Sequence, residues 1–174
     1  MIHDERISNK LLVLFVLDKM EIPINEDLLL SICSTDNEWI PYFYCKQIIA
    51  DLAEAGFITK IDGSVRNPIL ALTEDGRICL SHFYNDIPKS VRDTVTEYAR
   101  ATRLNYKKQQ EFLCDYKKNG DGSYTVEMSI QEITKPIMHL KFVVPNLQKA
   151  ISIYNQWNSK APEVYKSIYD ILID

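Results

Sequence analysis

Glycine and long apolar runs are both scarce in this chain. Five glycines occur among 174 residues, at positions 56, 63, 76, 120 and 122. They are too dispersed to form the glycine-rich loop that wraps a phosphate with backbone amides. The apolar run Leu11–Leu17 covers seven residues and is closed by Asp18 and Lys19, far short of the roughly 20 residues that a membrane span needs. We therefore expect a cytoplasmic protein with no membrane partner.

The cysteines show no metal-binding spacing. No C-x-x-C occurs, and the four thiols are widely separated among apolar neighbours, at Cys33, Cys45, Cys79 and Cys114. This pattern indicates reduced, mostly buried thiols rather than disulfides or a zinc site.

Catalytic motifs are missing as well. The sequence holds neither H-E-x-x-H nor G-x-S-x-G, and its histidines, His3, His82 and His139, form no cluster. His139 and Lys141 alternate with apolar residues in a strand-like pattern, which places both on the wetter face. We expect no enzymatic activity, no metal and no cofactor.

Charge is unevenly distributed along the chain. Residues 1–87 carry 7 Lys and Arg against 14 Asp and Glu, a net charge of −7, and residues 88–174 carry 13 against 10, a net of +3. Because Lys and Arg supply most of the affinity for DNA phosphates, the first half suits DNA only if its few cations gather on one face.

The first half predicts helices around a hairpin. Apolar spacing and capping residues place helices at about 7–20, after Asn25, from Pro41, and from Thr73. Gly56 should end the third helix in a left-handed conformation. The runs FITKI and PILAL around DGSVRN predict a hairpin with an exposed tip. The inner face of the third helix should comprise Ile48, Ile49, Leu52 and Ala55.

The second half predicts a long helix and a small α+β unit. Pro88 opens a helix to about residue 110, and three strands of a meander follow, two of them joined by NGDG. Asn146 should cap a helix that ends near Trp157, and Pro162 should start a last helix. We expect the domains 1–87, 88–111 and 112–174. The strand face Tyr124, Val126, Met128 and Ile130 should pack against Ile151, Ile153, Tyr154 and Trp157.

Two resemblances follow from these segments. Three helices before a hairpin, with L-x-E-x-G-F-I at 52–58 and L-T-x-x-G-x-x-x-L at 72–80, resemble bacterial winged helix-turn-helix regulators of the PadR and MarR type. The segments YFYCKQIIADL, DGSYTVEMSI and NQWNSKAPEVYKSI resemble an uncharacterised bacterial family of winged-helix-like proteins, a domain of unknown function. The second resemblance spans almost the whole chain. It implies the fold and the length, and no activity.

The winged-helix resemblance implies DNA binding. In such modules the third helix enters the major groove, and the wing contacts the backbone or the minor groove. By position, Gln47 would pair with adenine and Lys46 with guanine or phosphate. The full set of implied DNA contacts is Tyr42, Tyr44, Lys46 and Gln47 in the third helix, and Lys60, Arg66 and Asn67 in the wing.

The long helix carries two further faces of interest. Arg100, Arg103 and Lys107 share one side, either as a solvated face or as a supplementary contact to phosphates. Its apolar stripe packs either within the chain or at a homodimer interface, for which we expect Leu11, Leu14, Phe15, Val91, Val95 and Tyr98.

The sequence therefore predicts an α+β protein: a winged helix-turn-helix, a long connecting helix, and an antiparallel three-stranded meander packed by two C-terminal helices. We expect a transcriptional regulator that binds double-stranded DNA as a homodimer. One alternative is an adaptor whose winged helix contacts another protein. Another is a sensor with a small-molecule or protein effector at its C-terminal domain.

Overall fold

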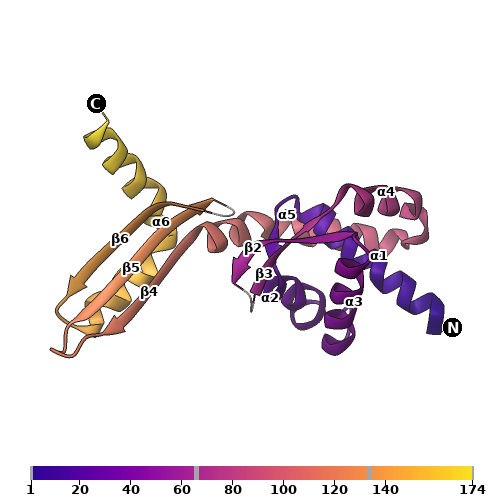
Figure 1. Cartoon of the computed structure of the whole chain (residues 1–174), viewed down its shortest axis with the longest axis horizontal. Helices are drawn as coiled ribbons and strands as arrows, with labels where there is room; N and C mark the ends of the chain where they lie inside the picture. Colours follow the sequence, from indigo (N-terminus) through magenta and orange to yellow (C-terminus); the bar gives the residue numbers. More distant parts are fainter. Residues whose placement is uncertain (1, 65–66, 133–134, 174) are drawn as a thin grey trace. The chain divides into compact units, whose positions relative to one another are not determined.

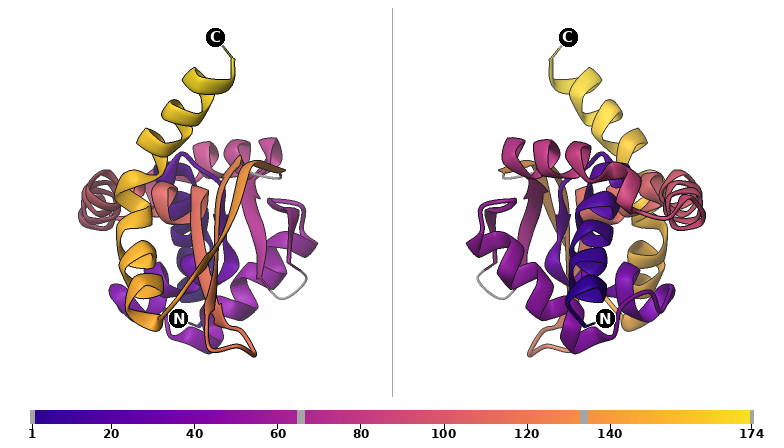
Figure 2. Two further views of the ribbon diagram at one scale, coloured as in Figure 1. Left: turned by 90° about the vertical axis from the view of Figure 1, so that its left-hand side faces the viewer. Right: turned by 90° about the vertical axis from the view of Figure 1, so that its right-hand side faces the viewer.

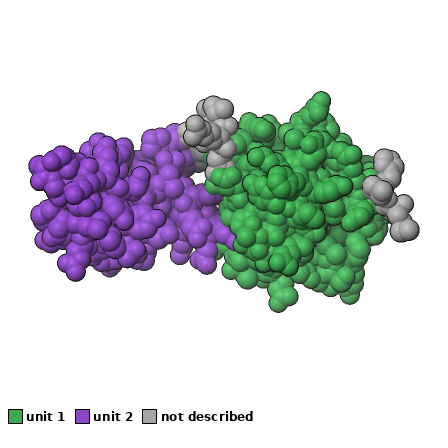
Figure 3. Space-filling view, turned by 90° about the horizontal axis from the view of Figure 1, so that it is seen from below, with its two compact units in different colours: residues 1–104 green, residues 105–174 purple. Residues whose placement is uncertain are grey.

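The chain folds into two compact units. The structure, a computed structural model, describes residues 2–64, 67–132 and 135–173 (Figure 1). The units are residues 1–104 and 105–174, which Figure 3 colours separately. The described residues form six α-helices and two three-stranded antiparallel sheets, so the predicted α+β class is confirmed. The boundary between the units lies inside the long helix Lys89–Glu111. This helix is therefore shared between the two units and does not form a separate part of the chain.

The first unit combines short helices with one small sheet. Its elements are α1 (Ile2–Met20), β1 (Ile24–Asn25), α2 (Glu26–Leu30), a π-helical turn η1 (Ser31–Asp36), α3 (Tyr42–Glu54), β2 (Ile58–Ser64), β3 (Asn67–Leu72), α4 (Glu74–His82), the 3-10 turn η2 (Tyr84–Asp86) and the start of α5 (Lys89–Glu111). The strand order is β1-β3-β2. The sequence predicts the hairpin β2–β3, whereas the pairing of β1 with β3 depends on a contact between distant segments.

Helix α1 forms the centre of the first core. Every side chain from Leu11 to Leu17 is buried, and the helix contacts α3, α4 and β3. Leu11, Leu14 and Phe15 are thus covered by their own chain and leave no apolar surface for a second copy. The homodimer itself stays a prediction, which light scattering at micromolar concentration checks.

The start of α5 is also packed within the first unit. Val95 is buried, and Val91 lines a hollow together with Leu12 and Trp39. The Tyr98 ring meets the Trp39 ring edge-on, with centroids 5.8 Å apart. The expected dimer stripe is therefore used inside the chain, because α5 needs this face to pack against the helices before it.

Short-range capping sets the ends of several helices as the sequence predicts. Asn25 accepts a hydrogen bond from the Leu28 amide at 2.8 Å, and Asn146 accepts one from the Lys149 amide at 3.0 Å. Gly56 has a φ of +80° after α3, which glycine adopts without steric cost. Ile48, Ile49 and Leu52 are buried as predicted. Ala55 is exposed, because it caps the helix where the backbone turns away from the core.

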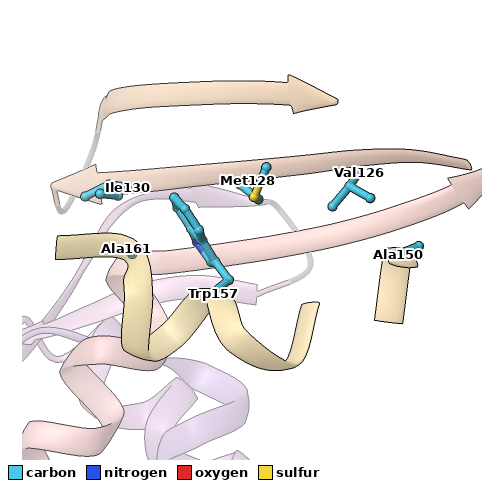
Figure 4. Close-up of a cluster of buried hydrophobic side chains, with 6 residues drawn as sticks. All are labelled: Val126, Met128, Ile130, Ala150, Trp157 and Ala161. Carbon is cyan, nitrogen blue, oxygen red and sulfur yellow. The ribbon is translucent and has the colours of Figure 1, made fainter. Parts of the chain in front are cut away.

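The second unit is a meander covered by one helix. Its strands β4 (Phe112–Lys118), β5 (Tyr124–Glu132) and β6 (Lys135–Val144) pair in chain order. The helix α6 (Leu147–Leu172) lies along one face of this sheet, and its C-terminal end extends beyond the strands (Figure 2). Trp157 packs against Val126, Met128 and Ile130 in the core, as predicted (Figure 4). Ile151 and Tyr154 are exposed instead, although the Tyr154 ring meets the ring of Tyr116 on β4 edge-on, with centroids 5.7 Å apart.

The prediction of two C-terminal helices was wrong. A single helix α6 runs through Pro162. Proline removes one backbone donor from a helix and normally ends or kinks it. Here Ala161 is buried, and Val164 and Tyr165 pack against the same core. The sheet therefore holds both sides of the proline in one helix, at the cost of one internal hydrogen bond.

Candidate nucleic-acid interface

Helix α3 has two different faces. Pro41 precedes the helix in an extended conformation, where proline fits because the first turn needs no amide donor. Cys45, Ile48 and Ile49 are buried on the inner face. The expected contact residues lie on the outer face, which is exposed: Tyr42, Tyr44, Lys46 and Gln47. All four predicted residues of this helix are therefore exposed to solvent.

An exposed aromatic group begins the outer face. Phe43, which sequence reasoning did not select, is 85% exposed, and its ring meets the Tyr42 ring edge-on at a centroid distance of 5.8 Å. A hollow of about 330 Å³ lies beside it, lined by Phe43, Tyr44 and Gln47 together with Arg6 and Ile48. Large exposed apolar side chains in a group are typical of a binding surface.

Asp51 organises the charges beside this face. Its carboxylate accepts hydrogen bonds from Gln47 Nε2 and Arg6 Nη2, both at 2.9 Å, and its Oδ2 lies 3.1 Å from Lys10 Nζ. The hydrogen bond from Gln47, followed by those from Arg6 and Lys10, lowers the Asp51 pKa to about 2. Arg6 and Lys10 thus supply two cations from α1, and one carboxylate holds both.

The predicted contacts of the hairpin are less well defined. Lys60 Nζ lies 4.0 Å from a carboxylate oxygen of Glu26, which offsets part of its charge. Asn67 begins β3, and Arg66 lies outside the described residues. Lys46 differs from Lys60, since within residues 2–64, 67–132 and 135–173 no carboxylate forms an ion pair with it.

The supplementary phosphate contacts do not form one free face. Arg103 forms an ion pair with Glu21, and Lys107 Nζ lies 3.8 Å from Glu111. Arg100 is exposed and lines a groove in the first unit. Two of the three side chains are therefore already engaged with carboxylates.

Sequence spacing identifies only part of this site. Gln47 and Asp51 are four residues apart on one helix, so their contact follows from helical geometry. Arg6 and Lys10 lie more than 40 positions before Asp51, and only the packing of α1 on α3 brings them together. No local pattern could have revealed that Asp51 neutralises them.

Other candidate chemistry in the chain is limited. Within the described residues, no group of three His, Cys, Asp or Glu side chains is placed to hold a metal ion. His139 and Lys141 are exposed on β6 as predicted, and both lie near Glu127 of β5, at 3.7 and 3.0 Å. None of the helices in the described ranges has the length and apolar character of a membrane span.

These features define an α+β protein of two units, with an exposed helix face in the first. The chain belongs to the family described as domain of unknown function DUF4364, whose model matches residues 9–172. The resemblance to an uncharacterised family is thereby confirmed over nearly the whole chain. Neither the curated proteins nor the solved structures contain a match. The family description names no fold and no activity, so the likeness to winged-helix regulators stays a prediction.

Proposed function

We propose that the chain is a transcriptional regulator that binds double-stranded DNA through its first unit. In this proposal the first unit is a winged helix-turn-helix, in which α3 enters the major groove and the hairpin β2–β3 contacts the backbone as the wing. The observation that carries the proposal is the outer face of α3. It presents Tyr44, Lys46 and Gln47 to solvent, while the opposite face anchors the helix in the core.

The cations of α1 add to this surface. Arg6 and Lys10 lie beside Gln47 through their shared partner Asp51. A DNA phosphate offers the same geometry to an arginine as a carboxylate does, so it can replace Asp51 as the partner of Arg6. Asp51 then acts as a competitor that keeps binding weak until DNA supplies several phosphates at once.

Fluorescence-polarisation titration of labelled genomic upstream fragments tests the proposal at several salt concentrations. Lys46→Ala should weaken binding to every sequence and lower the slope of log K against log salt by about one. Gln47→Ala should reduce the difference in affinity between preferred and random DNA sequences, with little change in the salt slope, because the Gln47 side chain would contact base edges. Asp51→Asn should strengthen binding, because it releases Arg6 and Lys10.

Lys166→Ala, in the exposed part of α6, is the matched control and should leave both affinity and slope unchanged. An absence of saturable binding at low salt, where phosphate attraction is least screened, would reject the proposal. Equal losses in Lys46→Ala and Lys166→Ala would show binding without a defined site.

A second candidate is a protein-binding adaptor. Phe43 is the observation that favours it, since an 85% exposed phenylalanine beside Tyr42 and a hollow suits the apolar centre of a protein interface. The net charge of −7 over residues 1–87 also repels nucleic acid. Loss of DNA binding in the titration above would make this the preferred function, and Phe43→Ala the variant with which to test a protein partner.

A further inference from the structure

We propose that the first unit contains a binding site for a small organic phosphate that also carries hydroxyl groups, such as a sugar phosphate. The site is a groove of about 640 Å³ lined by Lys19, Tyr84, Lys89, Arg92, Thr96 and Arg100, with Asp93 and Glu97 also in its wall. This volume falls in the range typical of small-molecule sites, about 300–1,000 Å³. The proposal is independent of DNA binding by α3.

One face of α5 forms the long wall of this α5 groove. Its residues recur at spacings of three and four from Lys89 to Arg100, which places them on one side of a helix. The eleven steps from Lys89 to Arg100, at a rise of 1.5 Å each, give this wall a length of about 16 Å. Lys19 at the end of α1 and Tyr84 of η2 contribute to the remaining wall.

The charge of the α5 groove favours an anion. The lining contains four cationic side chains and two carboxylates, and one of the cations, Lys19, also lies 3.1 Å from the Asp18 carboxylate, so a smaller surplus of positive charge remains. Lys89 also stands at the first residue of α5, where the helix dipole attracts an anion. Within the described ranges, Lys89, Arg92 and Arg100 form no ion pair.

Arg92 is the side chain best prepared to bind a phosphate. Its guanidinium carbon lies 4.4 Å from the centre of the Tyr84 ring, which fixes the orientation of the charged group. Its Nε atom is buried and makes no hydrogen bond to the described residues. Because the Nε atom has almost no accessible surface, a phosphate in the groove would have to be bound by the terminal Nη atoms of the guanidinium. A planar guanidinium can donate two parallel hydrogen bonds to such a group.

The carboxylates distinguish a small ligand from a nucleic acid. Asp93 and Glu97 are one helical turn apart and lie between Arg92 and Arg100 along the wall. They would repel a phosphate chain that ran the length of the α5 groove. Carboxylates do accept hydrogen bonds from sugar hydroxyls, and Thr96 between them can both donate and accept. A ligand with a single phosphate and neighbouring hydroxyls therefore matches this wall, in which carboxylates and Thr96 lie between the cationic side chains.

Isothermal titration calorimetry on the full chain tests this assignment. The probes are glucose 6-phosphate, glycerol 3-phosphate and adenosine monophosphate, compared with inorganic phosphate, glucose and a duplex of DNA. At least one organic phosphate should bind more tightly than inorganic phosphate, and glucose should not bind. Lys89→Ala and Arg100→Ala should each weaken that binding about tenfold, the loss expected for one charge-assisted hydrogen bond.

Lys108→Ala is the matched control, because Lys108 is exposed on the same helix and does not line the α5 groove. It should leave the affinity unchanged. The proposal is overturned if no organic phosphate binds more tightly than inorganic phosphate, or if Lys108→Ala weakens binding as much as Arg100→Ala. Duplex DNA that displaces the bound phosphate and depends equally on Lys89 and Arg100 would assign these cations to nucleic acid and also overturn it.

Discussion

The hydroxyl of Thr73 donates a 2.7 Å hydrogen bond to the carbonyl oxygen of Gly56, across the base of the hairpin β2–β3. The same hydroxyl accepts a 3.0 Å hydrogen bond from the Gly76 amide and so caps α4. The Thr73 amide also donates to the carbonyl of Phe57 at 3.1 Å. One residue thus ties the end of α3 to the start of α4. The threonine and the two glycines therefore act together at this junction.

Gly76 tests how tightly this junction is packed. A Cβ at Gly76 would lie 2.2 Å from the carbonyl oxygen of Phe57. Gly76→Ala should therefore lower the free energy of unfolding by about 1–3 kcal/mol, despite the higher helix propensity of alanine. Urea denaturation measures the change. Gly120→Ala is the control, since no atom lies within 4 Å of its added Cβ, and an equal loss in both variants would contradict the close contact.

Asp51 should make stability depend on acid pH. Its pKa is lowered from 3.8 to about 2 by Gln47, Arg6 and Lys10. A carboxyl whose pKa is lower in the folded state stabilises the fold above its unfolded pKa, and this contribution is lost as the pH falls through the folded pKa. The advantage of the native chain over Asp51→Asn should therefore be full above about pH 5 and shrink between about pH 4 and pH 2.

Urea midpoints at a series of pH values give this difference directly. Glu54→Gln serves as the control on the same helix, because Glu54 is exposed and forms no ion pair within the described ranges. A difference between the native chain and Asp51→Asn that stays constant down to pH 2 would show that the three hydrogen bonds do not persist in solution.

Trp157 should contribute to stability through its ring and not through its indole N–H. The side chain is 4% exposed, and its Nε1 atom has no hydrogen-bond partner in the described structure. Trp157→Ala should cost about 3–5 kcal/mol, because it leaves a cavity under β5. Trp157→Phe should cost less than about 2 kcal/mol, because it loses no hydrogen bond and keeps much of the volume. Equal costs for the two variants, measured by urea denaturation, would indicate a polar role for the indole.

The cysteines should fall into two reactivity groups. Cys33 and Cys45 are buried and hydrogen-bonded to each other, an interaction that raises the pKa of Cys33 and lowers that of Cys45. Cys79 and Cys114 are half-buried, and burial raises the pKa of both. Iodoacetamide followed by peptide mass spectrometry should label Cys79 and Cys114 first. The lower pKa of Cys45 does not help it, because no reagent reaches a buried thiolate without unfolding. Early labelling of Cys45 would show that this part of the core opens readily.

Local sequence determined the helix ends and the turns. Asn25, Thr73 and Asn146 accept hydrogen bonds from amides three residues ahead, and Gly56 adopts positive φ. These effects act within a few residues, so the sequence alone predicts them. The alternation of apolar and polar residues in β5 likewise predicts which face of the strand is buried. The sequence segments that resemble the uncharacterised family also identify the family to which the chain belongs.

Tertiary structure decided the features that depend on distant partners. Proline at 162 is a local signal for a helix start, yet burial of Ala161 and Val164 against the sheet keeps α6 continuous. An apolar α1 indicates burial without naming its partners, and only the packing shows that its own chain covers it. The same is true of Asp51 with Arg6 and of Arg92 with Tyr84. Charges and rings attract one another through space, and chain order does not record which of them the folded core brings together.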